Sequence, residues 1–89
     1  MNDTAMREFV LRTLKKFAPG ADLENLQPDK RFRDQLDFDS VDFLNFALAL
    51  QDGLQISIPE EDFPMLATLN GCLGYLPAKG AQITAVKSL

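Results

Sequence analysis

The apolar residues of this chain recur with the 3.6-residue period of an α-helix, and this pattern restricts the possible folds more than any other feature. It is clearest near the N-terminus, where a helix is predicted from about Thr4 to Phe17, followed by the helix-ending pair Pro19 and Gly20. The residues that would form its buried face are Met6, Phe9, Val10, Thr13, Leu14 and Phe17. The segment Ile56-Ser57-Ile58 resembles a strand, but a lone short strand would have no partner. The chain is therefore predicted to be all-α.

Three further helices are predicted, and with the first they make a small four-helix bundle of three main helices and one short helix. The second should run from about Ser40 to Gly53, because glycine favours a helix end. The third should be short, from Pro59 to about Phe63, because a proline followed by acidic residues favours a helix start. The last should run from a cap at Thr68 to about Leu76, and its two internal glycines should weaken it.

A long stretch from Gly20 to Asp39 joins the first two helices and shows no clear period. Apolar residues are spaced along it, namely Leu23, Leu26, Phe32, Leu36 and Phe38. Because these side chains can attach the stretch to the core at several points, we expect an ordered loop, with a helical turn near Asp22 to Leu26. We expect one domain over residues 1–77 and a flexible C-terminal tail over residues 78–89.

Composition excludes several classes of protein. The chain has 89 residues, one cysteine and no histidine, so an internal disulfide and the common zinc and nucleophile–base sites cannot form. Cys72 is expected to be a buried core residue. No apolar stretch approaches the roughly 20 residues that cross a bilayer, and the N-terminus does not resemble a signal peptide. We therefore expect a cytoplasmic monomer that is not an enzyme.

The acidic residues are concentrated in the middle of the chain. The segment from Asp34 to Asp62 contains eight Asp or Glu residues and no Lys or Arg, so its net charge is −8 while the remainder carries +4. Such a field opposes binding to nucleic acid and attracts partners with basic patches. A solvated acidic face that keeps the protein soluble explains the same charge equally well. Charge alone therefore leaves both interpretations open.

The second predicted helix is apolar on two sides, which is unusual for a helix with one buried face. One stripe, expected in the core, contains Phe43, Phe46, Ala47, Leu50 and Leu54. A second stripe lies roughly 130° away around the helix and contains Val41, Leu44 and Leu48. Polar residues flank this second stripe, so we expect it to face solvent beside Ser40 as a docking surface for partner proteins.

Ser40 is the residue that most clearly indicates a function. Taken alone, Asp39 and Ser40 are an ordinary helix start. The wider arrangement is more specific: an amphipathic helix, a long anchored loop, Asp-Ser opening a second helix, Ile58-Pro59-Glu60-Glu61, a short helix and a last helix ending in Tyr75-Leu76. Over roughly residues 4–76 this order resembles the acyl carrier proteins, and Ser40 corresponds to the serine of the family's Asp-Ser-Leu motif.

The resemblance implies a cofactor and a set of partners. A phosphopantetheinyl transferase, with Mg²⁺, would attach 4′-phosphopantetheine from coenzyme A to Ser40, and the thiol of this arm would hold acyl groups as thioesters. The other implied partners are acyl-transferring or acyl-activating enzymes with basic patches. The candidate partner-binding residues are Asp39, Val41, Asp42, Leu44, Leu48, Glu60 and Glu61. The carrier itself would catalyse no reaction.

Four positions depart from the usual pattern of the family. Asp37 stands where glycine is usual, and it would add negative charge near a phosphodiester on Ser40 while tolerating left-handed backbone. Val41 replaces the leucine of the motif, and Asn45 and Gln51 stand where housekeeping fatty-acid carriers usually have glutamate. These departures suggest a specialised carrier with its own partners. The resemblance itself leaves fatty acid biosynthesis, other lipid metabolism and polyketide or other secondary metabolism open as its pathway.

Two alternatives to an acyl carrier remain open. A peptidyl carrier of a nonribosomal pathway is the alternative within the family, although histidine rather than aspartate is common there before the serine. Outside the family, the alternative is an unmodified acidic helical interaction module in which Ser40 serves only as a helix cap.

Overall fold

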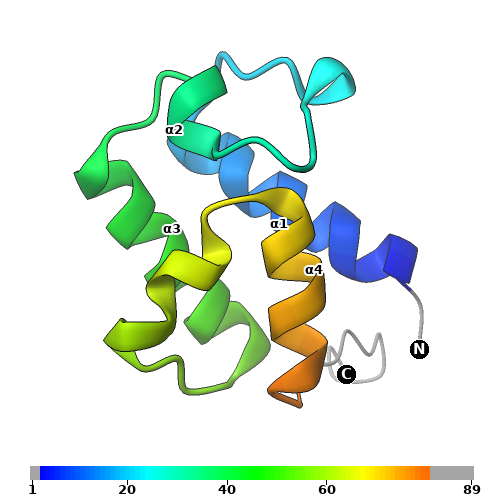
Figure 1. The fold of residues 1–89 in the computed structure, drawn as a ribbon, viewed down its shortest axis with the longest axis vertical. Coiled ribbons are helices and arrows are strands. Elements are labelled where there is room, and N and C mark those ends of the chain that lie inside the picture. The colour runs from blue at the N-terminus through cyan, green and yellow to red at the C-terminus, as the bar shows by residue number, and fades with distance from the viewer. Residues whose placement is uncertain (1–2, 81–89) are drawn as a thin grey trace.

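The structure is a computed structural model that describes residues 3–80, and all regular elements within these residues are helical. Three long helices, α1 (Asp3–Phe17), α3 (Ser40–Leu54) and α4 (Leu69–Ala78), are accompanied by a shorter 3₁₀-helix, η2 (Glu60–Leu66) (Figure 1). The predicted all-α fold, with three main helices and one short helix, is confirmed.

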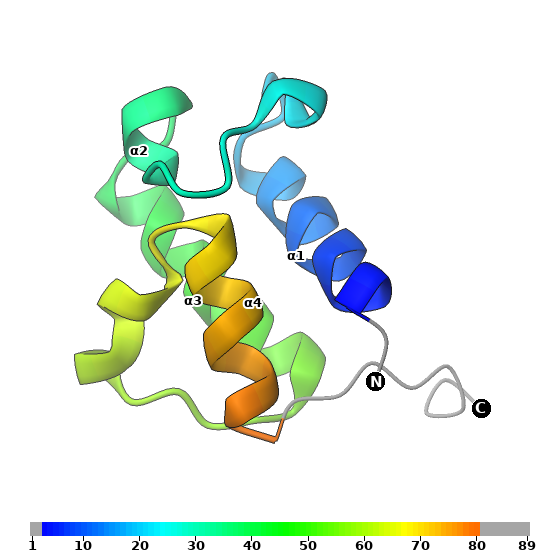
Figure 2. The same cartoon turned by 45° about the vertical axis from the view of Figure 1, so that its right-hand side comes forward.

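The three long helices surround a single core. α1 packs against both α3 and α4, and α4 also packs against η2 (Figure 2). Each long helix contributes apolar side chains that are almost completely buried, among them Met6, Val10, Leu14, Phe46, Ala47, Leu50, Leu69, Cys72 and Leu76. These residues recur at the helical period within their own helices, which is why the period in the sequence located the core correctly.

The loop between α1 and α3 is ordered, as predicted, and it contains two short helices. The expected turn is the 3₁₀-helix η1 (Leu23–Asn25), whereas α2 (Phe32–Gln35) was not predicted because four residues are too few to show a period. The backbone N–H of Phe32 donates a hydrogen bond to the carbonyl of Ala67 at 2.9 Å. With the buried ring of Phe32, this bond attaches α2 to the segment just before α4.

The end of α3 differs from the prediction. The helix continues to Leu54 and ends at Gln55, which has a left-handed backbone with φ of 56°. Gly53 therefore does not end the helix. A Cβ atom at position 53 would lie 2.6 Å from Cζ of Phe9, so the glycine instead allows α1 and α3 to pack closely.

The short helix η2 begins after Pro59 as predicted but extends beyond Phe63. It continues through Pro64 to Leu66, as a 3₁₀-helix of seven residues. A proline at position 64 would interrupt the hydrogen bonds of an α-helix. The observed helix has the tighter 3₁₀ pattern instead, with Ala67 donating its N–H to the carbonyl of Pro64 at 3.3 Å.

The last helix, α4, begins at the predicted cap. The side chain of Thr68 accepts a hydrogen bond from the N–H of Gly71 at 2.9 Å. Gly71 does more than weaken the helix, since a Cβ atom there would collide with the carbonyl of Met65. The helix continues to Ala78, past the expected end at Leu76. The expected domain boundary at residue 77 stays a prediction, and most of the expected tail, residues 81–89, lies outside the described residues.

Candidate functional site

The first turn of α3 is held by a reciprocal pair of aspartates. The side chain of Asp39 accepts the N–H of Asp42 at 2.8 Å, and the side chain of Asp42 accepts the N–H of Asp39 at 3.2 Å. Asp39 is therefore the cap, and Ser40 is the first helical residue. Ser40 is exposed, and its hydroxyl forms no hydrogen bond with any other residue of the described range 3–80. The arrangement fixes the backbone of Ser40 while leaving its hydroxyl free to react.

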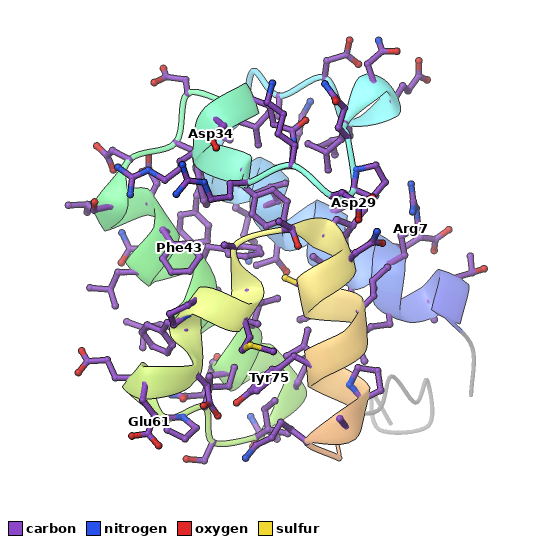
Figure 3. All side chains as sticks on the ribbon, viewed as in Figure 1. Arg7, Asp29, Asp34, Phe43, Glu61 and Tyr75 are labelled. Atoms are coloured by element: carbon purple, nitrogen blue, oxygen red, sulfur yellow. The ribbon has the colours of Figure 1, made fainter. Side chains whose placement is uncertain are left out.

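A pocket of about 380 Å³ lies beside Ser40, between α2, the start of α3 and η2. Phe32 and Phe38 are buried and Phe43 and Phe63 partly buried, and all four line this pocket. The rings of Phe43 and Phe63 meet edge to face with centroids 6.4 Å apart, which joins α3 to η2. Figure 3 shows Phe43 on α3, between α2 and η2. Phe43, predicted on the core stripe, packs against the core but is only partly buried, because it also lines this pocket.

Two arginines also line the pocket. Arg31 forms an ion pair with Asp34, with 2.7 Å between Nε and Oδ2, and its Nη2 lies 3.3 Å from Oδ1 of the same carboxylate. Arg33 has no ion-pair or hydrogen-bond partner within residues 3–80. Both arginines lie just before the acidic segment that begins at Asp34, so they were not included in its net charge. The fold nevertheless places them in the wall of the pocket that Ser40 also lines.

The second apolar stripe of α3 faces solvent, as predicted. Val41, Leu44 and Leu48 are 65%, 43% and 44% exposed. Their spacing of three and four residues places them on one side of the helix. Met65 of η2 is also 54% exposed, and it was not predicted to belong to an exposed apolar surface. The exposure of the stripe is confirmed, while its use in docking stays a prediction.

The acidic residues selected as partner-binding candidates fall into two groups. Asp39 and Asp42 are engaged in capping α3, so their carboxylates already accept backbone hydrogen bonds. Glu60 and Glu61 are exposed at the start of η2 and form no ion pair or hydrogen bond with other described residues. Figure 3 shows Glu61 at the outer end of η2. A partner could therefore reach the two glutamates without breaking an existing contact.

The structure changes the interpretation of two unusual residues. Asp37 does not have a left-handed backbone, since Gln55 is the one non-glycine residue with positive φ in the described part of the chain. Asp37 also lines a second hollow, with Ala18 and neighbouring residues, rather than the pocket beside Ser40. The side chain of Gln51 accepts the N–H of Ile58 at 2.8 Å, so it holds the segment after α3. A glutamate could accept the same bond, so Gln51 does not by itself indicate a special partner.

A hydrogen bond between Tyr75 and Asp62 fastens η2 to α4. The phenol donates to Oδ2 of Asp62 at 2.6 Å, and Figure 3 shows Tyr75 on the side of α4 that faces η2. Burial, the hydrogen bond and the negative charge of Asp62 together raise the pKa of Tyr75 to about 12. The sequence offers little signal for this pair, because 13 residues separate its members. The bond stabilises the helix that carries Phe63 to the pocket.

The expected buried position of Cys72 is confirmed. Its side chain is fully buried, and Sγ lies 3.5 Å from the carbonyl of Leu66 as a weak donor. Burial raises the pKa of this thiol to about 12. Cys72 therefore belongs to the core and not to the site at Ser40.

Within residues 3–80, no three His, Cys, Asp or Glu side chains gather closely enough to hold a metal ion. None of the helices in the same range has both the length and the apolar character needed to span a bilayer.

Comparison with known proteins identifies the family. Residues 8–76, which include Ser40, match a family model described as a phosphopantetheine attachment site. The chain is 32% identical over 60 residues to an acyl carrier protein of an Exiguobacterium species, covering 67% of this chain and 76% of that protein. It is 32% identical over 63 residues to an acyl carrier protein of Micrococcus luteus, with 71% and 75% covered. The fold and the site thus define a phosphopantetheine-binding protein. Within that class, the chain belongs to the acyl carrier protein family.

Proposed function

We propose that this protein carries acyl groups as thioesters on a 4′-phosphopantetheine arm, attached to Ser40 through a phosphodiester. The observation that carries the proposal is the exposed hydroxyl of Ser40 on the fixed first turn of α3, which has no hydrogen-bond partner among residues 3–80. The family model supports it, because Ser40 lies within the matched residues. When bound, the arm would supply a flexible thiol, which raises the effective concentration of an acyl group at each partner's active site.

The capping geometry favours this function over an unmodified interaction module. In such a module Ser40 would be expected to serve as the helix cap, but Asp39 has that role. A serine that neither caps the helix nor packs in the core contributes little to stability. Its position at the mouth of a pocket is consistent with a hydroxyl that a transferase modifies.

The outer side of α3 is proposed to bind the partner enzymes. Val41, Leu44 and Leu48 would supply apolar contacts, and the acidic residues nearby would guide partners with basic patches, the transferase among them. Because exposed charges are screened over about 10 Å at 0.1 M salt, association should slow as salt increases. Val41 in place of leucine, together with Asn45, suggests a specialised carrier, and we propose that it acts in the cytoplasm as a monomer.

The test is to incubate the protein with coenzyme A, Mg²⁺ and a transferase of broad specificity, and to measure its intact mass. The wild type should gain the mass of one phosphopantetheine, and Ser40→Ala should gain none while remaining folded. Ser57→Ala is the matched control, because Ser57 is exposed but lies after α3, away from the pocket. Modification of Ser40→Ala, or failure of the wild type with several transferases, would contradict the proposal.

A further inference from the structure

Arg33 and Ser40 line the same pocket, although the surrounding segment is strongly acidic. The residues from Asp34 to Asp62 carry eight acids and no base. The pocket wall therefore places a positive charge beside the one exposed hydroxyl at the start of α3. Arg33 is exposed, and its guanidinium group favours anionic oxygens as partners.

The turn that carries Arg33 is held firmly in place. Besides the bond from Phe32 to Ala67, the side chain of Gln35 donates to the carbonyls of Gln27 and Lys30, each at 2.9 Å. The same side chain accepts the N–H of Gln27 at 2.9 Å. The backbone of α2 is thus fixed at both ends, and an anion that binds Arg33 would have to order only the side chain.

The two arginines of the pocket differ in whether they are already paired. Arg31 is already paired with the carboxylate of Asp34, with two of its nitrogens near the two carboxylate oxygens. Arg33 has no such partner among the described residues. Arg33 is therefore the basic group of the pocket that remains available to an incoming anion.

We propose that Arg33 binds the phosphodiester that joins the arm to Ser40. This inference rests on the proposed function. A covalent bond to the Ser40 oxygen would hold the phosphate permanently at the mouth of the pocket, so its effective concentration there would exceed that of any free anion. A carboxylate at the far end of an acyl group would have to fold back along the whole arm to reach the same place.

The pairing would offset the repulsion that a phosphodiester meets at this position. Asp39 and Asp42 lie within two residues of Ser40, and Asp37 lies three residues before it. Each adds negative charge close to Ser40 along the chain. A charge-assisted hydrogen bond from a planar guanidinium counters this repulsion directly and restrains the first atoms of the arm.

The test uses phosphoserine incorporated at position 40 during translation, so that a phosphate is present without any transferase. The second pKa of a phosphoserine is ordinarily about 6, and ³¹P NMR during a pH titration measures it at this one site. A nearby guanidinium stabilises the dianion, so Arg33→Gln should raise this pKa by about half a unit at low salt. Arg33→Lys keeps the positive charge and should restore most of the wild-type value.

Arg12→Gln is the matched control, because Arg12 is exposed on α1, does not line the pocket, and its loss changes the net charge equally. A shift in Arg33→Gln no larger than in Arg12→Gln would overturn the inference, even if Ser40 is loaded with phosphopantetheine. A larger shift in Arg33→Gln supports the anion site, even if the mass test of the carrier function fails. The two proposals can thus fail separately.

Discussion

The two apolar sides of α3 have similar composition but opposite surroundings. Phe46, Ala47 and Leu50 are completely buried, whereas Leu44 and Leu48 on the other side are 43% and 44% exposed. The difference arises because α1 packs against α3 and the buried side of α3 faces the shared core, whereas none of the described helices covers the other side in the same way. The hydrophobicity of a helix thus indicates how much surface it could bury, while the neighbouring elements determine which side is buried.

The largest effect on stability should come from the buried side. Phe46→Ala removes a fully buried ring that packs against Phe32 with centroids 5.5 Å apart. The resulting cavity should lower the free energy of unfolding by roughly 3–5 kcal/mol, measured by chemical denaturation. Affinity for the transferase should change little in the fraction that remains folded. A loss of less than about 1 kcal/mol would mean that the core can close around the gap.

The packing of α4 can be tested with a pair of glycines in one helix. Gly71→Ala should destabilise the protein by roughly 1–3 kcal/mol, because its Cβ would collide with the backbone carbonyl of Met65. Gly74→Ala meets no atom within 4 Å and should stabilise the helix by up to about 1 kcal/mol. Thermal unfolding of the two variants measures the contrast. Equal shifts in the same direction would contradict the close contact between α4 and η2.

The hydrogen bond of Tyr75 links the packed side of the molecule to the pocket. Its folded-state pKa of about 12 exceeds the ordinary value of 10.0, so the stability it contributes is complete below pH 10 and is lost as pH rises towards 12. Tyr75→Phe should remove this pH dependence and lower stability near neutral pH by about 1 kcal/mol.

Tyr75 is the single tyrosine of the chain, so phenolate absorbance during a pH titration follows this residue alone. Cys72 also ionises with a pKa of about 12, and therefore the difference between wild type and Tyr75→Phe is the informative quantity. An ordinary pKa for the phenol would show that the bond to Asp62 does not persist in solution.

The smallest effect on stability should come from the exposed side of α3. Leu44→Ala should change the free energy of unfolding by no more than about 0.5 kcal/mol, as other surface substitutions do. Its affinity for the transferase should fall by roughly 1 kcal/mol, or about fivefold, if the stripe docks partners. Titration calorimetry measures the affinity. A Leu44→Ala variant as unstable as Phe46→Ala would reverse the assignment of the two sides.

Features that depend on neighbouring residues in the sequence could be predicted well. The cap at Asp39, the cap at Thr68 and the turn at η1 each follow from short patterns of side chains and backbone groups. The two stripes of α3 follow from the helical period, and the exposure of Leu44 agrees with the polar residues around it. The helix start at Asp39 and Ser40 is an ordinary local signal, and Ser40 was selected because the order of elements over roughly residues 4–76 resembles the acyl carrier proteins.

Features made by distant residues could not be predicted in the same way. The pocket brings together α2, α3 and η2. How far Phe43 is exposed therefore depends on Phe63, which lies twenty residues later in the sequence. The role of Gly53 depends on Phe9, which the sequence places on another helix. Arg33 was not predicted for a related reason. It lies just outside the acidic segment in the sequence, but the fold places it in the same pocket as Ser40.

The burial of Cys72 has a consequence for the chemistry of a thioester carrier. Transfer of an acyl group between thiols requires a thiolate, and a pKa of about 12 leaves roughly one Cys72 side chain in 10⁵ ionised at pH 7. The side chain is also closed to solvent. Because the chain has no other cysteine, its own sulfur would neither capture the cargo nor form a mixed disulfide with the arm. No thiol of the carrier itself would therefore compete with an external acceptor for an activated acyl group.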